Sequence, residues 1–286
     1  MKKLGIIVDS FCGHTKKHVE KYPDTFFIPL RVIVDGEEIK DGIDMEMSAL
    51  MKKLDNGKEV KTSQPSPKDI SEAIEKASKE YENVIYFAVS TALSGTANTA
   101  KMLSKDIKNI EVVPHTMIGD YSLIFGQKLI SDMNDGLDFA SIMGEVKKIS
   151  SEFPTYVIPK SNEALLRGGR LPKSIAYILT KLKTVPVIGF EDNEKLHKKG
   201  IKRSGIKAIK FVIDKIEKTI SSIKFDYEWT ISHTLDEEFS MKARKLLLDK
   251  GYKVDYQLTS GVIDAHVGSG AMSLGLRRIF NKKKTS

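Results

Sequence analysis

The chain has 286 residues, of which 41% are hydrophobic and 29% are charged, a balance typical of globular proteins and unlike that of disordered or collagen-like chains. Its one cysteine, Cys12, excludes an intramolecular disulfide and a multi-cysteine metal site, so we expect a reducing compartment. The formal net charge of +8 comes without aromatic-interleaved basic patches or a nucleic-acid-binding motif, so we expect no nucleic-acid partner.

The beginning of the chain lacks the pattern of an export signal. Asp9 interrupts the apolar run that starts at Leu4, before the run reaches the length of a signal peptide. No apolar stretch approaches the roughly 18 residues that span a bilayer. We therefore expect a cytoplasmic protein.

The first half of the chain alternates short apolar runs with segments whose apolar residues recur at three- and four-residue spacing. These patterns predict strands and helices, respectively. Asp35-Gly36, after the second run, is a strong signal for a hairpin turn. The alternation implies a mainly parallel sheet with helices on its faces. The predicted strands are 4–8, 26–34, 84–89, 110–113 and 156–158, and the predicted helices are 67–81, 96–105, 121–133 and 139–153.

The helix predicted at 67–81 has clear entry signals. Ser66 can accept from the backbone as N-cap, Pro67 suits the first helical position, and Asp69 favours the positive end of the helix. We therefore expect 61–65 to be a loop held at a fixed angle. Ser94-Gly95-Thr96 follows the strand at 84–89 and opens the next helix, at the edge where open parallel sheets bind ligands.

The pattern changes after about residue 161. A turn-rich junction at 167–172 precedes a predicted apolar helix at 175–182, an apolar run at 185–190 and a basic segment at 195–210. Further predicted elements are helices near 208–220 and 236–249, a strand near 228–232 and an apolar run at 254–258. We expect a two-lobed α/β protein, with an N-terminal three-layer α/β/α lobe at 1–160 and a C-terminal α+β lobe at 161–286.

Two hydroxyl-rich segments are candidates for binding an anionic group. Thr62 and Ser63 in one segment, and Ser94 and Gly95 in the other, can supply hydroxyl and backbone N–H donors near predicted helix N-termini. Helix capping explains the same residue types. The residues alone favour capping over anion binding, because Ser and Thr are common N-caps.

An alternative function is a stand-alone lipid or ester hydrolase that uses Ser94 as its nucleophile. His266 would be the base and Asp9 or Asp264 the orienting acid. The Gly-x-Ser-x-Gly elbow is missing, because position 92 is alanine and position 96 is threonine. The chain also lacks a P-loop and zincin-type histidine spacing, so we expect no metal and no resident cofactor.

Six segments, taken in order, resemble the DegV family of fatty-acid-binding proteins, which serve bacterial fatty-acid kinase. Any one of them is a weak signal, but their common order along nearly the whole chain is specific. They are Ile7-Val8-Asp9-Ser10, Thr62-Ser63-Gln64-Pro65-Ser66, Leu93-Ser94-Gly95-Thr96, Gly168-Gly169-Arg170, the basic segment with Arg203, and His266-Val267-Gly268-Ser269-Gly270.

The resemblance implies a non-enzymatic subunit that buries a long-chain fatty acid between or within two lobes. Thr62 and Ser94 would hydrogen-bond the carboxylate, with the Gly95 N–H as a helper. Arg203 and His266 would lie near the head group, where the family couples them to the kinase reaction. The implied partners are a fatty-acid kinase that phosphorylates the acid to an acyl phosphate, and an acyltransferase that takes the product toward phospholipid synthesis. The basic residues at 195–210 could contact an anionic membrane surface or an acidic kinase surface, or form an ordinary solvated face.

Overall fold

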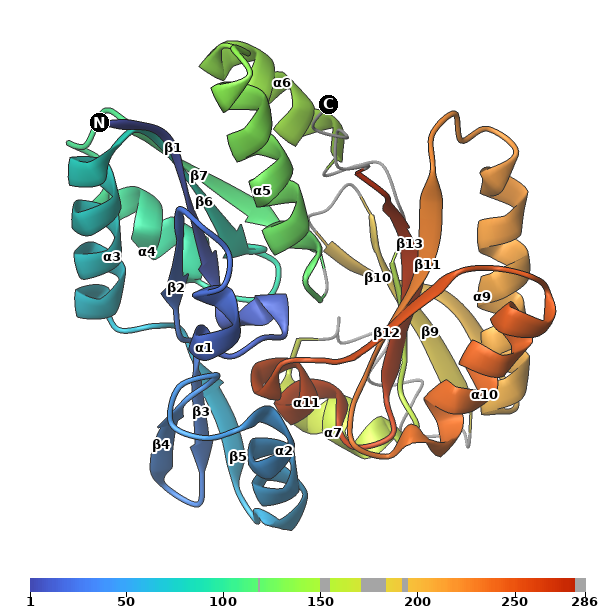
Figure 1. Ribbon diagram of the computed structural model, residues 1–286. Coiled ribbons are helices and arrows are strands. Elements are labelled where there is room, and N and C mark those ends of the chain that lie inside the picture. Colours follow the sequence, from blue (N-terminus) through green and yellow to red (C-terminus); the bar gives the residue numbers. More distant parts are fainter. Residues whose placement is uncertain (118, 150–154, 171–183, 192–194, 281–286) are drawn as a thin grey trace.

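Three sheets organise the residues that the computed structural model describes, which are 1–117, 119–149, 155–170, 184–191 and 195–280. In Figure 1 the N-terminal lobe, coloured blue to green, stands beside the C-terminal lobe, coloured yellow to red. The elements are β1 (Lys2–Asp9), a 3₁₀ turn (Ser10–Cys12), α1 (Lys16–Val19), β2 (Thr25–Ile28), β3 (Arg31–Val34), β4 (Glu37–Lys40), α2 (Met47–Asn56), β5 (Val60–Ser63), α3 (Pro67–Glu80), β6 (Tyr81–Val89), α4 (Thr96–Leu103), β7 (Ile110–His115), α5 (Tyr121–Asn134), α6 (Phe139–Ile149), β8 (Tyr156–Ile158), α7 (Asn162–Gly168), β9 (Val185–Glu191), β10 (Lys195–Lys202), α9 (Gly205–Ile220), β11 (Tyr227–His233), α10 (Glu237–Asp249), β12 (Val254–Leu258), α11 (Gly261–Val267) and β13 (Met272–Arg278).

The N-terminal lobe is built on a parallel sheet of order β2-β1-β6-β7. Successive side chains of a strand point to opposite faces. Ile6 and Phe87 accordingly pack against α5 and α6, whereas Ile7 and Tyr86 pack against α3 and α4. The predicted three-layer α/β/α arrangement with a parallel sheet is confirmed.

The segment predicted as one strand at 26–34 is two strands in different sheets. β2 ends at Ile28, and β3 begins at Arg31 and joins a small antiparallel sheet of order β4-β3-β5. Pro29 provides no N–H for a continuous ladder, and the Leu30 N–H donates instead to the Ser10 hydroxyl at 3.1 Å. The predicted turn at Asp35-Gly36 is confirmed, with positive φ at both residues as a type I′ turn requires.

The loop predicted at 61–65 is wrong in its first half, because residues 60–63 form β5, which pairs with β3. The predicted entry of α3 is confirmed. Ser66 Oγ accepts from the Asp69 N–H at 3.1 Å, and Pro67 opens the helix. The helix ends at Glu80 because Tyr81 already belongs to β6. The helix predicted at 175–182 and the end of that predicted at 139–153 lie outside the described residues.

The C-terminal lobe contains a six-stranded mixed sheet of order β10-β9-β8-β13-β11-β12. Helices α9 and α10 cover one of its faces, where Trp229, Ile231 and Leu274 belong to a core shared with those helices. The opposite face turns toward the N-terminal lobe. β8 lies before the boundary expected at residue 160, yet it pairs with β9 and β13 of this sheet.

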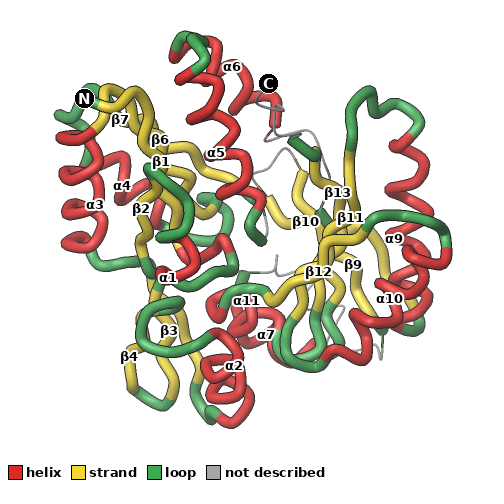
Figure 2. The backbone as a smooth tube through the Cα atoms, in the orientation of Figure 1, coloured by secondary structure: helices red, strands yellow, loops and turns green. Residues whose placement is uncertain are grey.

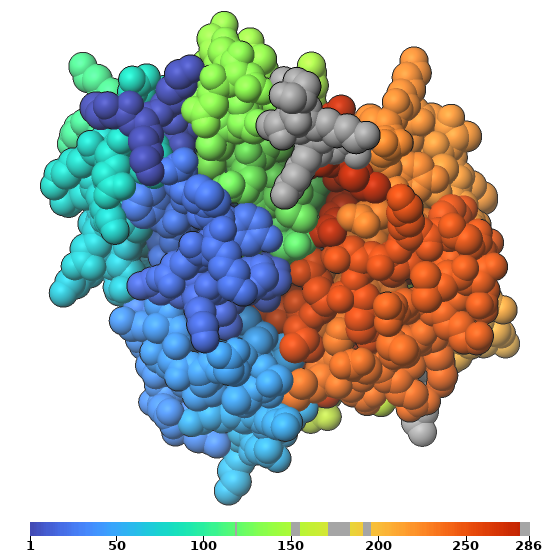
Figure 3. All heavy atoms as spheres, in the orientation of Figure 1, coloured from blue at the N-terminus to red at the C-terminus, as the bar shows by residue number. Residues whose placement is uncertain are grey.

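The lobes are joined by α11 and by one buried arginine. α11 is C-terminal in sequence but packs on α2, β3 and β5 of the N-terminal lobe (Figure 2). Arg277 on β13 contacts Asp120, which precedes α5, and also Glu228 at 2.9 Å and Asp255 at 3.2 Å. The two lobes meet along a continuous seam on the face shown in Figure 3. Among the described helices, none has the length and apolar character that crossing a membrane would need.

Candidate functional site

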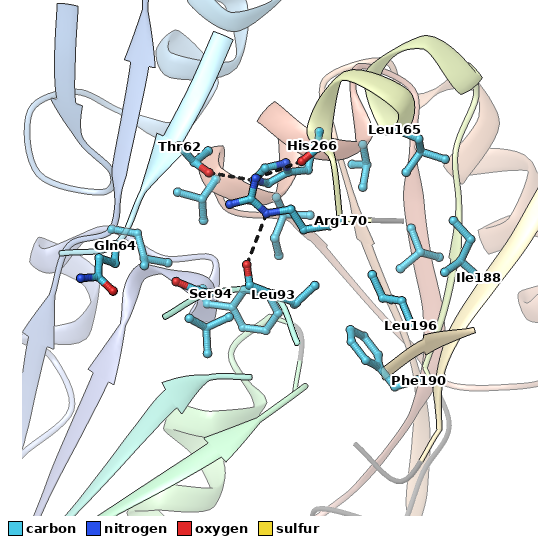
Figure 4. Close-up of a pocket in the computed structure, with 18 of the residues that line it drawn as sticks. Thr62, Gln64, Leu93, Ser94, Leu165, Arg170, Ile188, Phe190, Leu196 and His266 are labelled. Carbon is cyan, nitrogen blue, oxygen red and sulfur yellow. Dashed lines mark hydrogen bonds between the residues drawn. The ribbon is translucent and has the colours of Figure 1, made fainter. Parts of the chain in front are cut away.

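A pocket of about 900 Å³, counted with the space at its open mouth, lies between the two lobes. The walls come from both lobes and are mainly apolar (Figure 4). The apolar lining residues are Phe11, Leu30, Val89, Leu93, Val157, Leu165, Ile188, Phe190, Leu196, Val262, Ile263 and Val267.

The strand register explains why these residues share one surface. Ile188 and Phe190 are two residues apart on β9, so their side chains point to the same face of the sheet. Leu196 on β10 pairs with Phe190. Val157 on β8 pairs with Ile188, which continues the same face. One apolar face of the C-terminal sheet therefore forms a wall of the pocket, opposite the 3₁₀ turn and β5 of the N-terminal lobe.

Polar groups gather at one end of the pocket. Thr62 lies on β5 and His266 lies near the end of α11, and Thr62 Oγ1 is 2.8 Å from His266 Nε2 (Figure 4). This hydrogen bond joins two residues that are far apart in sequence and belong to different lobes. The docking of α11 on the small N-terminal sheet is what brings them together.

His266 is neutral at neutral pH. Burial, and secondarily the positive charge of Arg170, lower its pKa to about 4. Gly168 packs directly against the imidazole, and a Cβ at that position would lie 2.8 Å from Nδ1. The ring is thus held in place and acts as a neutral hydrogen-bonding group rather than a cation.

Ser94 lies beside the same end of the pocket, at the start of α4. Its hydroxyl is 2.9 Å from Thr96 Oγ1, and Gly95 is the N-cap residue of the helix. A helix N-terminus favours negative charge. A ligand oxygen placed between Thr62 and Ser94 would therefore meet two hydroxyls and a favourable helix end.

Arg170 spans the mouth of the pocket from one lobe to the other. Its Nη1 donates to the Gly168 carbonyl at 3.0 Å, and its Nε donates to the Leu93 carbonyl at 3.3 Å. The side chain is exposed, so its charge is partly screened by water. Its positive charge contributes to lowering the pKa of His266.

The structure brings together four of the predicted site residues and not the other two. Thr62, Ser63, Ser94 and His266 all line the pocket. Gly95 is not among the described residues that line it, and a Cβ there would lie 2.8 Å from the Gln64 side-chain oxygen.

Arg203 is not brought to the pocket. It is exposed in a bend between β10 and α9. Leu196, near the other end of β10, lines the pocket, and six residues of chain separate it from Arg203. The head-group role that the resemblance implies for Arg203 stays a prediction, and the arginine that lines the pocket is Arg170, in the segment Gly168-Gly169-Arg170.

Sequence reasoning also missed Gln64 and the whole apolar lining. Gln64 accepts a hydrogen bond from Thr99 Oγ1 at 3.1 Å and thereby ties β5 to α4 beside the pocket. Its position directly after Ser63 in a segment already singled out was the one available signal. Apart from Leu93 and Val267, which stand in segments already singled out, the apolar lining residues gave no signal, because protein cores and pocket walls use the same residue types.

The arrangement does not assemble the nucleophile, base and acid of a hydrolase. Within the described part of the chain, Ser94 hydroxyl contacts Thr96, and His266 contacts Thr62 rather than Ser94. Asp9 accepts from the backbone N–H groups of Phe11 and Val89 inside the N-terminal lobe. No cluster of three or more metal-ligating side chains occurs among the described residues.

Two buried carboxyl groups lie at α11, one of them in the helix itself. Asp41 accepts from the N–H groups of Gly261 and Val262, both at 3.3 Å, and so caps the N-terminus of the helix. Asp264 is 3% exposed, and its Oδ1 has no hydrogen-bond partner among the described residues. Burial is the main cause that raises the pKa of Asp264 to about 7.

Asp264→Asn should therefore gain stability relative to the wild type as the pH rises. Between about pH 4 and pH 7 the unfolded wild type releases this proton while the folded wild type keeps it, so the wild type loses stability that the variant does not lose. Above about pH 7 the difference should be constant. Urea unfolding of both proteins at several pH values measures this, and a pH-independent difference would contradict the assignment.

Comparisons with known proteins agree with this architecture. A family model described as "Uncharacterised protein, DegV family" matches residues 3–278. A DegV domain-containing protein of Mycoplasmopsis pulmonis is 26% identical over 97% of this chain and 96% of its own length. Another, from Caldanaerobacter subterraneus, is 30% identical over 84% of this chain and 85% of its own length.

Solved structures show the same fold. A fatty acid binding DegV family protein from Streptococcus agalactiae has a TM-score of 0.84 and 22% identity, over 98% of this chain and 100% of that one. DegV from Bacillus subtilis, described as a fatty acid binding protein, has a TM-score of 0.82 and 21% identity, over 98% and 100%. A stearic acid-binding protein from Eubacterium ventriosum has a TM-score of 0.80 and 23% identity, over 96% and 98%. The chain belongs to the DegV family.

Proposed function

We propose that this protein is a cytoplasmic carrier that binds one long-chain fatty acid in the pocket between its lobes and presents the carboxylate to a separate fatty-acid kinase. The observation that carries the proposal is an apolar pocket with Thr62, Ser94 and His266 gathered at one end. The family relatives of similar fold that are described as fatty-acid-binding proteins support it. The protein itself contributes binding and geometry and not catalysis.

The apolar walls supply most of the affinity. Each methylene moved from water into such a pocket contributes about 0.8 kcal/mol, so a long acyl chain gains on the order of 10 kcal/mol before ordering costs are subtracted. The carboxylate then needs only enough donors to offset its desolvation. Hydroxyl groups meet that need without enclosing the carboxylate in an ion pair, so its oxygen stays available to accept a phosphoryl group.

The Thr62–His266 hydrogen bond can run in two directions, and only one of them leaves the threonine proton for the carboxylate. If Nε2 of the neutral imidazole carries its proton, His266 donates to Thr62 Oγ1, and the threonine hydroxyl is free to donate to the ligand. In the other tautomer the threonine donates to His266 and offers the carboxylate only lone pairs. Carboxylate binding therefore selects the tautomer with the proton on Nε2.

The kinase would bring ATP and Mg²⁺, and the acyl phosphate would stay in the pocket until an acyltransferase consumes it. Phosphoryl transfer depends mostly on positioning and charge stabilisation, which two proteins can share. Lys198, Arg203, Lys207 and Lys210 are exposed on one segment of the C-terminal lobe. We assign this basic surface to contact with an acidic kinase surface or an anionic membrane.

Mass spectrometry of the organic extract of the purified protein tests the carrier function against the hydrolase alternative. A carrier should release a near-stoichiometric amount of long-chain fatty acid acquired in the expression host, and it should leave ester substrates intact. A fatty-acid-free extract together with ester hydrolysis that depends on Ser94 would favour the hydrolase and refute the carrier.

Arg170→Ala should weaken fatty-acid binding by about two- to five-fold, because the variant loses a partly screened positive charge at the mouth of the pocket. The matched variant Arg203→Ala removes an exposed arginine far from the pocket and should leave the affinity unchanged. Displacement of a fluorescent fatty acid at low and high salt measures both. Equal effects of the two variants, or a larger effect of Arg203→Ala, would contradict the assignment of Arg170 to the site.

A further inference from the structure

A second, much smaller cavity, with room for a group about the size of one water molecule, adjoins the acyl pocket and differs from it in chemistry. The two share three wall residues, Val157 from β8 and Ile263 and Val267 from α11. Ile263 and Val267 are four residues apart and so lie on one face of the helix. On the far side of this partition the lining is rich in hydroxyls, with Ser232, Thr234, Thr259 and Ser273.

The register of the C-terminal sheet shows that the acyl wall runs directly into the hydroxyl-lined cavity. Ile188 pairs with Val157, Val157 pairs with Ser273, and Ser273 pairs with Ser232. These four residues form one row across four strands on the same face of the sheet. Neighbouring strands are about 4.8 Å apart, so Ser232 lies about 14 Å across the sheet from Ile188.

Two hydroxyls of the cavity lack a protein partner. Ser232 is 2% exposed and Thr259 is 3% exposed, and neither hydroxyl oxygen has a hydrogen-bond partner among the described residues. The other two are engaged, because Thr234 donates to backbone carbonyls of Gly268 and Ala271 and Ser273 donates to that of Ser232. Buried hydroxyls are nearly always paired, so these two are available to pair with a water molecule or a ligand group inside the cavity.

We propose that the hydroxyl-lined cavity is a subsite for an oxygen-bearing substituent on the acyl chain, with a monohydroxylated long-chain fatty acid as the ligand class. The inference rests on the proposed fatty-acid binding and adds a preference to it. Val157, Ile263 and Val267 line both cavities, so an acyl chain in contact with these residues places its substituents beside the hydroxyl-lined cavity. A ligand hydroxyl can both donate to one of these oxygens and accept from the other.

Binding of stearate and of positional isomers of hydroxystearate tests the proposal, with the hydroxyl placed near the carboxyl, at mid-chain and near the methyl end. One isomer should bind more tightly than stearate. Ser232→Ala removes one hydroxyl, and Thr259→Val removes the other while keeping the side-chain shape. Each variant should lower the ratio of hydroxystearate to stearate affinity by about five-fold for that isomer. Trp229 fluorescence, from the adjacent core, reports whether each variant is folded.

The outcomes separate this inference from the proposed function. If stearate does not bind the wild type, fatty-acid binding itself is refuted. If stearate binds but no isomer exceeds it, or if the preferred isomer keeps its advantage in both variants, the cavity holds only water and the subsite is refuted. Selective loss of the preference for one isomer, with folding intact, supports the subsite.

Discussion

A protein that carries both Thr62→Val and Ser94→Ala should form acyl phosphate at least about 100-fold more slowly than the wild type when supplied with fatty acid, ATP and a fatty-acid kinase. Each substitution removes one hydroxyl donor to the proposed carboxylate, and a hydrogen bond to a charged group contributes about 1.5–3 kcal/mol. Losing two such bonds corresponds to a factor of about 100 or more. Thr62→Val keeps the shape of the side chain, so the apolar walls stay intact.

The matched control is Thr62→Ser, which keeps the hydroxyl that faces His266. It should retain most of the rate, while Thr62→Val alone should lower the rate by about 10-fold or more. The reaction is measured as acyl phosphate trapped with hydroxylamine at a saturating kinase concentration. An unchanged rate in the double variant would show that the two hydroxyls do not position the carboxylate.

Arg277→Met should lower the free energy of unfolding by about 3–5 kcal/mol. Arg277 is 7% exposed and contacts Asp120, Glu228 and Asp255, so its removal leaves three carboxylates facing one another without a cation. Asp120 comes from the N-terminal lobe, whereas the other two come from β11 and β12. The loss should therefore loosen the contact between the lobes as well as the C-terminal sheet.

Urea unfolding followed by the fluorescence of Trp229, the single tryptophan, measures this loss. Adding Asp120→Asn and Asp255→Asn to Arg277→Met should recover part of it, because the stranded charges are removed as well. The exposed Arg203→Met serves as the surface control and should change stability by less than about 0.5 kcal/mol. A loss no larger than that of the control would show that the ionic cluster does not stabilise the fold.

The N-terminal sheet could be predicted well from sequence because its rules are local. Buried parallel strands read as apolar runs such as 84–89, and helices such as α3 carry capping residues at fixed positions. The small β4-β3-β5 sheet was missed because its strands have only four residues each, too few for a periodic pattern. Because this sheet was not predicted, Thr62 was wrongly assigned to a loop. The sequence analysis nevertheless placed Thr62 at the candidate site.

The polar residues of the candidate site could be predicted from sequence motifs, whereas the apolar walls between the lobes could not. Thr62, Ser94 and His266 stand in distinctive segments, and the resemblance to a family linked them. The walls of the pocket depend on which face of β8, β9 and β10 turns toward the N-terminal lobe, and that follows from strand register across distant parts of the chain. No local pattern distinguishes Ile188, which lines the pocket, from Val187, which packs in the core.

The central claim is that the pocket holds a fatty acid with its carboxylate between Thr62 and Ser94. Nuclear magnetic resonance of the protein with palmitate enriched in ¹³C at the carboxyl carbon tests it most directly. One bound resonance should saturate at one ligand per chain, and it should shift in Thr62→Val and in Ser94→Ala but not in Arg203→Ala. A carboxyl resonance that matches free palmitate, or one that ignores both hydroxyl variants, would contradict the claim.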